Sequence, residues 1–247
     1  MLTCNITSTL IAERMKHKLF LFDLDDTLLD FRASEKLSFV RTMQALGLHE
    51  PIDGLFTDYQ AINTDLWRKF ETGAVTKDFL KVERFRATFA KHGLALDPEA
   101  ASQLYLDSLP DTVVLIDGAR EVCATLAAIG EVGIITNGVE TIQNRRIASS
   151  GLGDCISFVA TSEACGHAKP DVRFFEYAAN MARPFVKEEA IIIGDRLDAD
   201  ILGANRYGID SCWFNPGRIA NTSEAVPTFE VTSLHDIVPA LKALALA

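Results

Sequence analysis

Two acidic residues end an apolar run near the start of the chain, where Asp23 and Asp25 follow the sequence KLFLF of residues 18–22. A continuously apolar run is typical of a strand that is buried on both faces of a parallel sheet. Carboxylates at the end of such a strand are costly in free energy unless a cation offsets their charge. Mg²⁺ does this well because it prefers carboxylate, carbonyl and water oxygens. The segment therefore indicates a metal site, with a solvated acidic turn as the alternative.

A second acidic segment, GDRLDAD at residues 194–200, follows the apolar run AIII. Asp195 stands at the end of its predicted strand as Asp23 does, and Asp200 falls in the first turn of the next predicted helix. The helix dipole favours acidic residues in a first turn, which by itself would explain Asp198 and Asp200. It explains Asp195 less well, so Asp195 is the stronger candidate for a metal ligand.

Thr136 ends the apolar run EVGIIT of residues 131–136, and Asn137 and Gly138 then precede a predicted helix. A hydroxyl, an amide and backbone N–H groups at a helix N-terminus can together bind an anion. The same residues would also form an ordinary helix cap with a turn glycine. This segment alone leaves both interpretations open.

A lysine, Lys169, precedes Pro170 and Asp171. The proline fits the first turn of a helix that we predict over residues 171–181, where it would fix the approach of the lysine. A lone lysine is usually a solvated surface residue. This segment therefore indicates a site only in company with the other three.

The elements that must position these residues alternate along the chain. We expect strands at residues 18–23, 131–136, 156–161, 190–195 and 210–214, with an edge strand at 229–231. The intervening helical patterns cover residues 119–129, 140–150, 171–181, 199–207 and 234–246. Such alternation predicts an α/β fold, in which helices flank a Rossmann-like parallel sheet and the crossovers are right-handed.

Residues 31–110 interrupt this alternation, because their apolar residues recur at helical spacing and form no convincing strand. We expect an inserted all-helical cap, with helices at residues 34–46, 55–71, 77–92 and 98–108. Residues 16–30 and 111–247 would then form the α/β core, and residues 1–15 a weakly structured extension. Ligands bind beyond the carboxyl ends of parallel strands, so an insert that leaves the first strand there can act as a lid.

Composition narrows the range of partners. The 247 residues carry a formal net charge of −10 without a basic face, which makes a nucleic-acid duplex an unfavourable partner. No apolar run reaches the roughly 20 residues needed to cross a bilayer, so we expect no membrane association. Five scattered cysteines without a CxxC pair favour reduced thiols in a cytoplasmic protein over a disulfide framework or a zinc site. The oligomeric state stays open, and a monomer is compatible with the sequence.

Taken together, the four segments resemble the motifs of the haloacid dehalogenase superfamily, in the right order from about residue 16 to the C-terminus. Asp23, Asp25 and Thr27 match the first motif, DxDxT. Thr136 matches the second motif and Lys169 the third. The fourth motif, GDxxxxD, matches Asp195 and Asp200.

This resemblance implies a Mg²⁺-dependent phosphomonoesterase. Asp23 would be the nucleophile that forms an aspartyl phosphate. Asp25 would protonate the leaving oxygen and then activate water. Mg²⁺ would be held by the Asp23 carboxylate, the Asp25 backbone carbonyl and Asp195, with support from Asp200. Phosphoryl oxygens would be bound by Thr136, Asn137 and Lys169.

The motif residues also distinguish between the dehalogenases and the phosphatases of this superfamily. A dehalogenase needs no metal and lacks the acid at the position of Asp25, so the sequence favours phosphoryl transfer. The segments DYQAIN at residues 58–63 and IITNG at residues 134–138 are similar to the bacterial YjjG-type pyrimidine 5′-nucleotidases. The implied substrate is a small phosphorylated metabolite, specifically a nucleoside 5′-monophosphate with a preference for pyrimidines. A phosphatase for another metabolite, such as a sugar phosphate, and a non-catalytic binding protein on the same fold are the alternatives.

Three residues of the predicted cap, Tyr59, Asn63 and Trp67, share one helical face because they are four residues apart. Such a face could stack on a base and hydrogen-bond to its edge. An aromatic stripe at this spacing is more often the core of its own unit. Three arginines of the same region, Arg68, Arg84 and Arg86, are predicted to be surface charges, with contact to a sugar or phosphate as the alternative for one of them.

Overall fold

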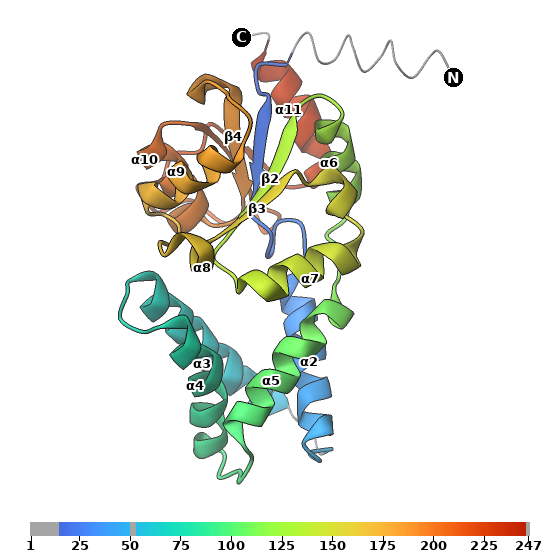
Figure 1. Ribbon diagram of the computed structural model, residues 1–247, viewed down its shortest axis with the longest axis vertical. Helices are drawn as coiled ribbons and strands as arrows, with labels where there is room; N and C mark the ends of the chain where they lie inside the picture. Colours follow the sequence, from blue (N-terminus) through green and yellow to red (C-terminus); the bar gives the residue numbers. More distant parts are fainter. Residues whose placement is uncertain (1–14, 50–52, 246–247) are drawn as a thin grey trace, which may run out of the picture. The chain divides into compact units, whose positions relative to one another are not determined.

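The computed structural model describes residues 15–49 and 53–245, and it divides into two compact units (Figure 1). One unit combines the described residues up to Asp30 with those from Val114 onward, and the other is Phe31–Val113. The predicted extension, residues 1–15, lies outside the described residues except for Met15. The insert that we predict at residues 31–110 corresponds to most of the second unit.

The first unit contains a six-stranded sheet in the order β3-β2-β1-β4-β5-β6, and all neighbouring strands are parallel. This confirms the predicted α/β fold with a Rossmann-like sheet. The strands are β1 (Leu19–Phe22), β2 (Glu131–Thr136), β3 (Phe158–Thr161), β4 (Ala190–Gly194), β5 (Asp210–Phe214) and β6 (Phe229–Val231).

The central strands are buried throughout, as their continuous apolarity indicates. All four residues of β1 and all five of β4 are buried. In the β1–β4 register, Phe22 lies opposite Ile193. The residues that follow these two strands, Asp23 and Asp195, therefore emerge next to each other at one edge of the sheet.

Helices cover both faces of this sheet (Figure 1). On one face, Phe174 and Phe175 pack against Leu19, Leu21 and Ile192 in a buried cluster. Figure 1 shows α6 and α11 on the opposite side of the sheet from α9 and α10. The helices of this unit are α6 (Ala119–Ala127), α7 (Glu140–Ser150), α8 (Ser162–Cys165), α9 (Val172–Met181), α10 (Leu202–Tyr207) and α11 (Ile237–Leu244).

Two predicted helices of this unit differ in detail. The segment predicted at residues 199–207 begins with a π-helical turn, Leu197–Ile201, before α10 starts. The segment predicted from residue 234 begins with a 3₁₀ turn, Leu234–Asp236, and α11 ends at Leu244. Apolar periodicity alone does not distinguish these tighter and wider turns from α-helix.

Over its described residues the second unit forms helices and no strand, and it is built around its own aromatic core. Its helices are α2 (Phe31–Ala45), α3 (Asp53–Glu71), α4 (Lys77–Lys91) and α5 (Pro98–Ser108), followed by a 3₁₀ turn, Leu109–Thr112. The ring of Tyr59 lies 4.7 Å from Phe39, 5.1 Å from Phe85 and 5.9 Å from Tyr105 between centroids. Aromatic pairs at these separations contribute packing energy beyond the area that they bury.

The helical face that carries Tyr59 and Asn63 belongs to this internal packing. Tyr59 is fully buried, and Asn63 is buried with its amide donating to Oε1 of Glu35 at 2.8 Å. Trp67 is only partly buried and contacts Phe70 in a T-shaped arrangement, with 5.7 Å between the ring centroids. The structure therefore favours the core interpretation for Tyr59 and Asn63 over base recognition.

The expectation of surface charge is wrong for Arg84, which is only 3% exposed. Its guanidinium carbon lies 4.5 Å from the centroid of the Tyr105 ring, and Nη1 donates to Oδ1 of Asn63 at 3.4 Å. An arginine can be buried in this way because its planar head stacks on aromatic faces. Arg68 and Arg86 are on the surface as predicted.

None of the helices formed by residues 15–49 and 53–245 combines the length and the apolarity that a bilayer crossing requires.

The packing of α10 on α9 yields a stability prediction. A Cβ at Gly203 would overlap the ring of Phe175, which is fully buried and cannot move aside. We expect Gly203→Ala to lower the free energy of unfolding by roughly 1–3 kcal/mol, although alanine is the better helix former. Gly153→Ala is the control, because a Cβ there meets nothing within 4 Å. Urea unfolding followed by circular dichroism checks this, and equal midpoints for the two variants would contradict it.

Candidate active site

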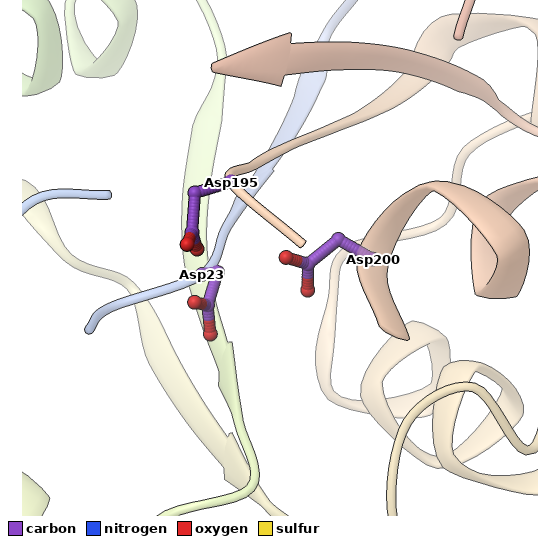
Figure 2. A group of neighbouring side chains, drawn as sticks. All are labelled: Asp23, Asp195 and Asp200. Carbon is purple, nitrogen blue, oxygen red and sulfur yellow. The ribbon is translucent and has the colours of Figure 1, made fainter. Parts of the chain in front are cut away.

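Three carboxylates from separate segments converge beyond the ends of β1 and β4 (Figure 2). Asp23 follows β1, Asp195 follows β4, and Asp200 lies in the π-helical turn after β4. One oxygen from each of these residues lies within 4.8 Å of the others. The backbone N–H of Asp23 donates to the carbonyl of Ile193 at 2.9 Å, which extends the pairing of the two strands to the site.

Lys169 supplies the positive charge at this cluster. Its ammonium donates to Oδ1 of Asp23 at 2.6 Å, to Oδ1 of Asp200 at 2.7 Å and to the carbonyl of Ile135 at 2.8 Å. These three bonds use all three N–H groups of the ammonium. Lys169 is 2% exposed, so its charge acts on Asp23 and Asp200 with little screening by water.

The loop that carries Lys169 is held by Asn137. The Asn137 side chain accepts from the Lys169 backbone N–H at 2.9 Å and donates to the Lys169 carbonyl at 3.2 Å. Asp171 is the N-cap of α9, and Pro170 precedes it. The expectation that Pro170 lies in the first helical turn is therefore wrong, because the capping carboxylate of Asp171 places the start of the helix at Val172.

Asp200 approaches the backbone of β4 closely. A Cβ at Gly194 would overlap the Asp200 carboxylate, so the glycine of the GDxxxxD segment leaves room for this side chain. The backbone N–H of Arg196 donates to Oδ2 of Asp200 at 3.1 Å, while Oδ1 accepts from Lys169. Both oxygens of this fully buried carboxylate are thus engaged within the first unit.

Asp195 is held by the loop after β1 and by a side chain of strand β5. Its carboxylate accepts from the Thr27 hydroxyl at 3.2 Å, and its backbone carbonyl accepts from the Trp213 indole N–H at 2.9 Å. Between the first-motif residues, Asp26 has a φ of 58°, in the left-handed region that aspartate tolerates better than most residues. This turn brings Thr27 back toward the end of β4.

Burial shifts the ionisation of the cluster strongly. Burial is the main cause that raises the pKa of Asp23 to about 7; the charge of Lys169 opposes the rise, and that of Asp200 adds to it. Burial, followed by the charges of Asp23 and Asp200, raises the pKa of Asp195 to about 8. Burial alone would lower the pKa of Lys169, but Asp200 and Asp23 together raise it above its ordinary value. One lysine therefore does not fully balance three carboxylates.

An excess of buried negative charge of this kind favours the binding of a cation. Buried carboxylates with raised pKa values gain free energy when a cation enters beside them, and carboxylate oxygens suit a hard divalent ion. Asp23, Asp195 and Asp200 are the residues that could hold one. The Asp25 carboxylate is not part of this group.

Asp25 instead faces helix α7. Its Oδ1 accepts from Nη1 of Arg146 at 2.6 Å, and its Oδ2 accepts from the amide of Gln143 at 2.7 Å. The same Gln143 amide donates to the hydroxyl of Thr136 at 3.0 Å. Thr136 and Asp25, two residues that the sequence marks as functional, are therefore linked through one side chain of α7.

Reasoning from the sequence missed Gln143 and Arg146. Helix α7 has the sequence ETIQNRRIASS, in which few residues are apolar. Yet Gln143 and Arg146 are buried together with Ile142 and Ile147. One signal could have identified them: a glutamine and an arginine three residues apart share a face of the helix that follows the TNG segment.

The chain also matches known proteins over most of its length. Residues 17–208 match the haloacid dehalogenase-like hydrolase family. The chain is 35% identical to the HAD-hydrolase YfnB of Bacillus subtilis, over 90% of this chain and 94% of YfnB. The crystal structure of YfnB bound to magnesium superposes with a TM-score of 0.85 and covers 92% of this chain and 99% of that one.

Two further relatives carry the name pyrimidine 5′-nucleotidase. PynA of Streptococcus pneumoniae is 35% identical over 92% of this chain and 96% of its own. YjjG of Escherichia coli is 29% identical over 90% of this chain and 97% of its own. The matched family, the identity to YfnB and PynA and the geometry of the carboxylate–lysine cluster all agree, and the chain belongs to the haloacid dehalogenase-like hydrolases.

Proposed function

We propose that this hydrolase is a Mg²⁺-dependent phosphomonoesterase that forms an aspartyl phosphate on Asp23 and acts on nucleoside 5′-monophosphates, with a preference for pyrimidines. The observation that carries the proposal is the buried cluster in which Lys169 bridges Asp23 and Asp200 beside Asp195. The names of PynA and YjjG support the substrate class. The non-catalytic alternative does not fit a chain that keeps every acid and the lysine of the four motifs.

In the first half-reaction, a carboxylate oxygen of Asp23 attacks phosphorus, and the bond between phosphorus and the ester oxygen breaks. Lys169 fixes the orientation of the Asp23 carboxylate through its bond to Oδ1. The departing oxygen takes a proton from the Asp25 carboxyl group and leaves as the 5′-hydroxyl of the nucleoside. An acyl phosphate on Asp23 remains.

In the second half-reaction, water attacks the acyl phosphate while Asp25 accepts its proton. The bond between phosphorus and the Asp23 oxygen breaks, which restores the Asp23 carboxylate and releases inorganic phosphate. Asp25 thus ends protonated, ready for the next ester. Its place outside the buried cluster, with its carboxyl group 29% exposed, suits a group that must meet both the leaving oxygen and water.

The residues present fit a Mg²⁺ ion. We propose that the carboxylates of Asp23 and Asp195 and the backbone carbonyl of Asp25 would hold it, with Asp200 in support. When bound, Mg²⁺ supplies the positive charge that three carboxylates and a phosphoryl group need in order to lie together. The YfnB crystal structure bound to magnesium supports this choice of metal.

Thr136 is suited to bind a phosphoryl oxygen. Its hydroxyl oxygen accepts from the Gly138 backbone N–H and from Gln143, both at 3.0 Å. Because a hydroxyl has two acceptor sites and one donor, these two bonds leave the O–H as the group that could donate to a phosphoryl oxygen. For Asn137 the bonds to the Lys169 backbone support a positioning role. Direct phosphoryl contact by Asn137 and Lys169 remains a prediction.

A panel of phosphate esters tests the substrate class. We expect Mg²⁺-dependent phosphate release from UMP, dUMP and CMP with kcat/KM at least about tenfold above that for AMP or for hexose phosphates, since that ratio corresponds to about 1.4 kcal/mol of transition-state discrimination. Sugar phosphates that outrank every nucleotide would instead support the other phosphatase function. Absence of release from all nucleoside monophosphates would exclude the nucleotidase.

Replacing the nucleophile tests the mechanism. Asp23→Asn should lower kcat by roughly three orders of magnitude or more, because the amide cannot form the acyl phosphate. Asp198→Asn is the matched control, since Asp198 is exposed and pairs with Arg196 outside the cluster. Steady-state phosphate release measures both, with circular dichroism to verify folding. Near wild-type turnover by Asp23→Asn would refute covalent catalysis by this residue.

Metal binding should depend on pH in a defined direction. The pKa values of Asp23 and Asp195 are raised to about 7 and about 8, so these groups bind protons more tightly in the folded protein than in the unfolded chain. Without metal, their contribution to stability is present at acidic pH and is lost as pH rises through 7 and 8. Mg²⁺ displaces these protons, so it should stabilise the protein more at pH 8 than at pH 6, by on the order of 1–3 kcal/mol.

Melting temperatures with Mg²⁺ and with EDTA at the two pH values measure this difference. The Asp195→Asn variant should lose most of the pH dependence of the Mg²⁺ effect. An equal increase in melting temperature at pH 6 and pH 8 for the wild type would contradict the ionisation states assigned to Asp23 and Asp195.

A further inference from the structure

A buried arginine of helix α7 holds the carboxylate that acts as acid and base in the proposed reaction. Arg146 is 1% exposed and is among the largest fully buried side chains of the described residues. Burying a guanidinium is costly unless it is paired and hydrogen-bonded. Its Nη1 forms a 2.6 Å bond with Oδ1 of Asp25, whose segment lies 121 positions earlier in the chain.

The bonds form a closed ring of three side chains. Nη1 of Arg146 donates to Asp25 and also to Oε1 of Gln143, at 2.8 Å. The Gln143 amide nitrogen donates to Oδ2 of Asp25 at 2.7 Å and to Thr136 at 3.0 Å. Both N–H groups of this amide and both N–H groups of Nη1 are therefore used, and each oxygen of Asp25 has its own donor.

Backbone geometry accommodates this ring. A Cβ at Gly138 would overlap the amide of Gln143, so the glycine of the TNG segment gives Gln143 access to Asp25 and Thr136. Helix α7 also buries Ile142, directly before Gln143, and Ile147, directly after Arg146, so apolar packing flanks the two polar residues. The positions of Gln143 and Arg146 are thus set by packing and do not depend on a flexible surface contact.

The Asp25 carboxylate lies outside the cluster of the other three carboxylates. Asp23, Asp195 and Asp200 each place an oxygen within 4.8 Å of the others, whereas the Asp25 carboxylate is not part of that group. A fourth carboxylate would be drawn toward a cation held there, and it could not then reach the ester oxygen. Two fixed donors on α7 counter that attraction with charge-assisted bonds.

We propose that Gln143 and Arg146 are positioning residues for the acid and base Asp25: they hold its carboxylate away from the cation cluster and in line with the departing oxygen. This inference rests on the proposed phosphatase function. The competing interpretation is that Arg146 and Gln143 only stabilise the fold of α7. In that case their loss would affect every substrate equally.

The dependence of rate on the leaving group distinguishes the two interpretations. A leaving group such as p-nitrophenolate departs without a proton, whereas phenolate or a nucleoside 5′-oxygen needs one. The test therefore compares kcat/KM for a series of aryl esters from p-nitrophenyl phosphate to phenyl phosphate, together with UMP. The ratio of two rates measured on one preparation does not depend on the fraction of protein that is folded.

Asp25→Asn sets the reference, with a ratio of p-nitrophenyl to phenyl phosphate at least about a hundredfold above wild type, as loss of a general acid implies. Arg146→Met and Gln143→Leu should raise the same ratio about ten- to a hundredfold. Arg146→Lys should restore part of it. Arg145→Met is the matched control, because Arg145 is exposed on the same helix, and its ratio should match wild type. In the double variant with Asp25→Asn, Arg146→Met should raise the ratio no further.

Wild-type ratios in the Arg146 and Gln143 variants, beside an altered ratio in Asp25→Asn, would overturn the inference, as would additivity in the double variant. A wrong substrate class would give a different result, in which the wild type hydrolyses the aryl esters but not UMP. The aryl series would still decide the roles of Arg146 and Gln143. A wild type inactive on every ester would overturn both the proposed function and this inference.

Discussion

The ammonium of Lys169, shared between Asp23 and Asp200 away from water, is the interaction on which the site depends. Carboxylates repel one another most strongly where water cannot screen them, and each buried charge is costly by itself. A single lysine between two of them reduces that cost but does not remove it, as the raised pKa values of Asp23 and Asp195 show. The remaining imbalance is the electrostatic basis on which we propose a cation at this site.

Sheet topology produces this convergence. The strand order β3-β2-β1-β4-β5-β6 places β1 between β2 and β4, so the connections after β1 leave the sheet beside those of both neighbours. In doubly wound folds a crevice opens at this point, outside the carboxyl ends of the strands, and ligands bind there. Asp23, Thr136 and Asp195 all stand at such ends. The β4 turn contributes Asp200, and Gly194 makes room for it.

The helical unit is stabilised by a core of its own that combines aromatic rings with a buried polar network. Its aromatic residues pack on one another around Tyr59, and the buried polar chain of Glu35, Asn63 and Arg84 runs through the same core. A buried polar network of this kind specifies one arrangement of helices, because breaking it would leave charges unpaired. The residues whose sequence pattern suggested base recognition are therefore largely committed to holding this unit together, which leaves the partly buried Trp67 as the member of that face with exposed surface.

The sequence by itself determined the class of fold, the order of the elements and the residues of the four motifs. Buried parallel strands carry continuous apolar runs, and motif residues stand where those runs end, so both are local in the sequence. Thus β2, β5, α5 and α7 have the bounds predicted for them. Only the tertiary structure decided which long polar side chains are buried. Arg146 and Arg84 look like ordinary surface arginines in their helices, and their partners lie on other segments of the chain. Hydrophobic periodicity carries no information about such partners, because a charged side chain is buried only where a group distant in the sequence forms a hydrogen bond with it.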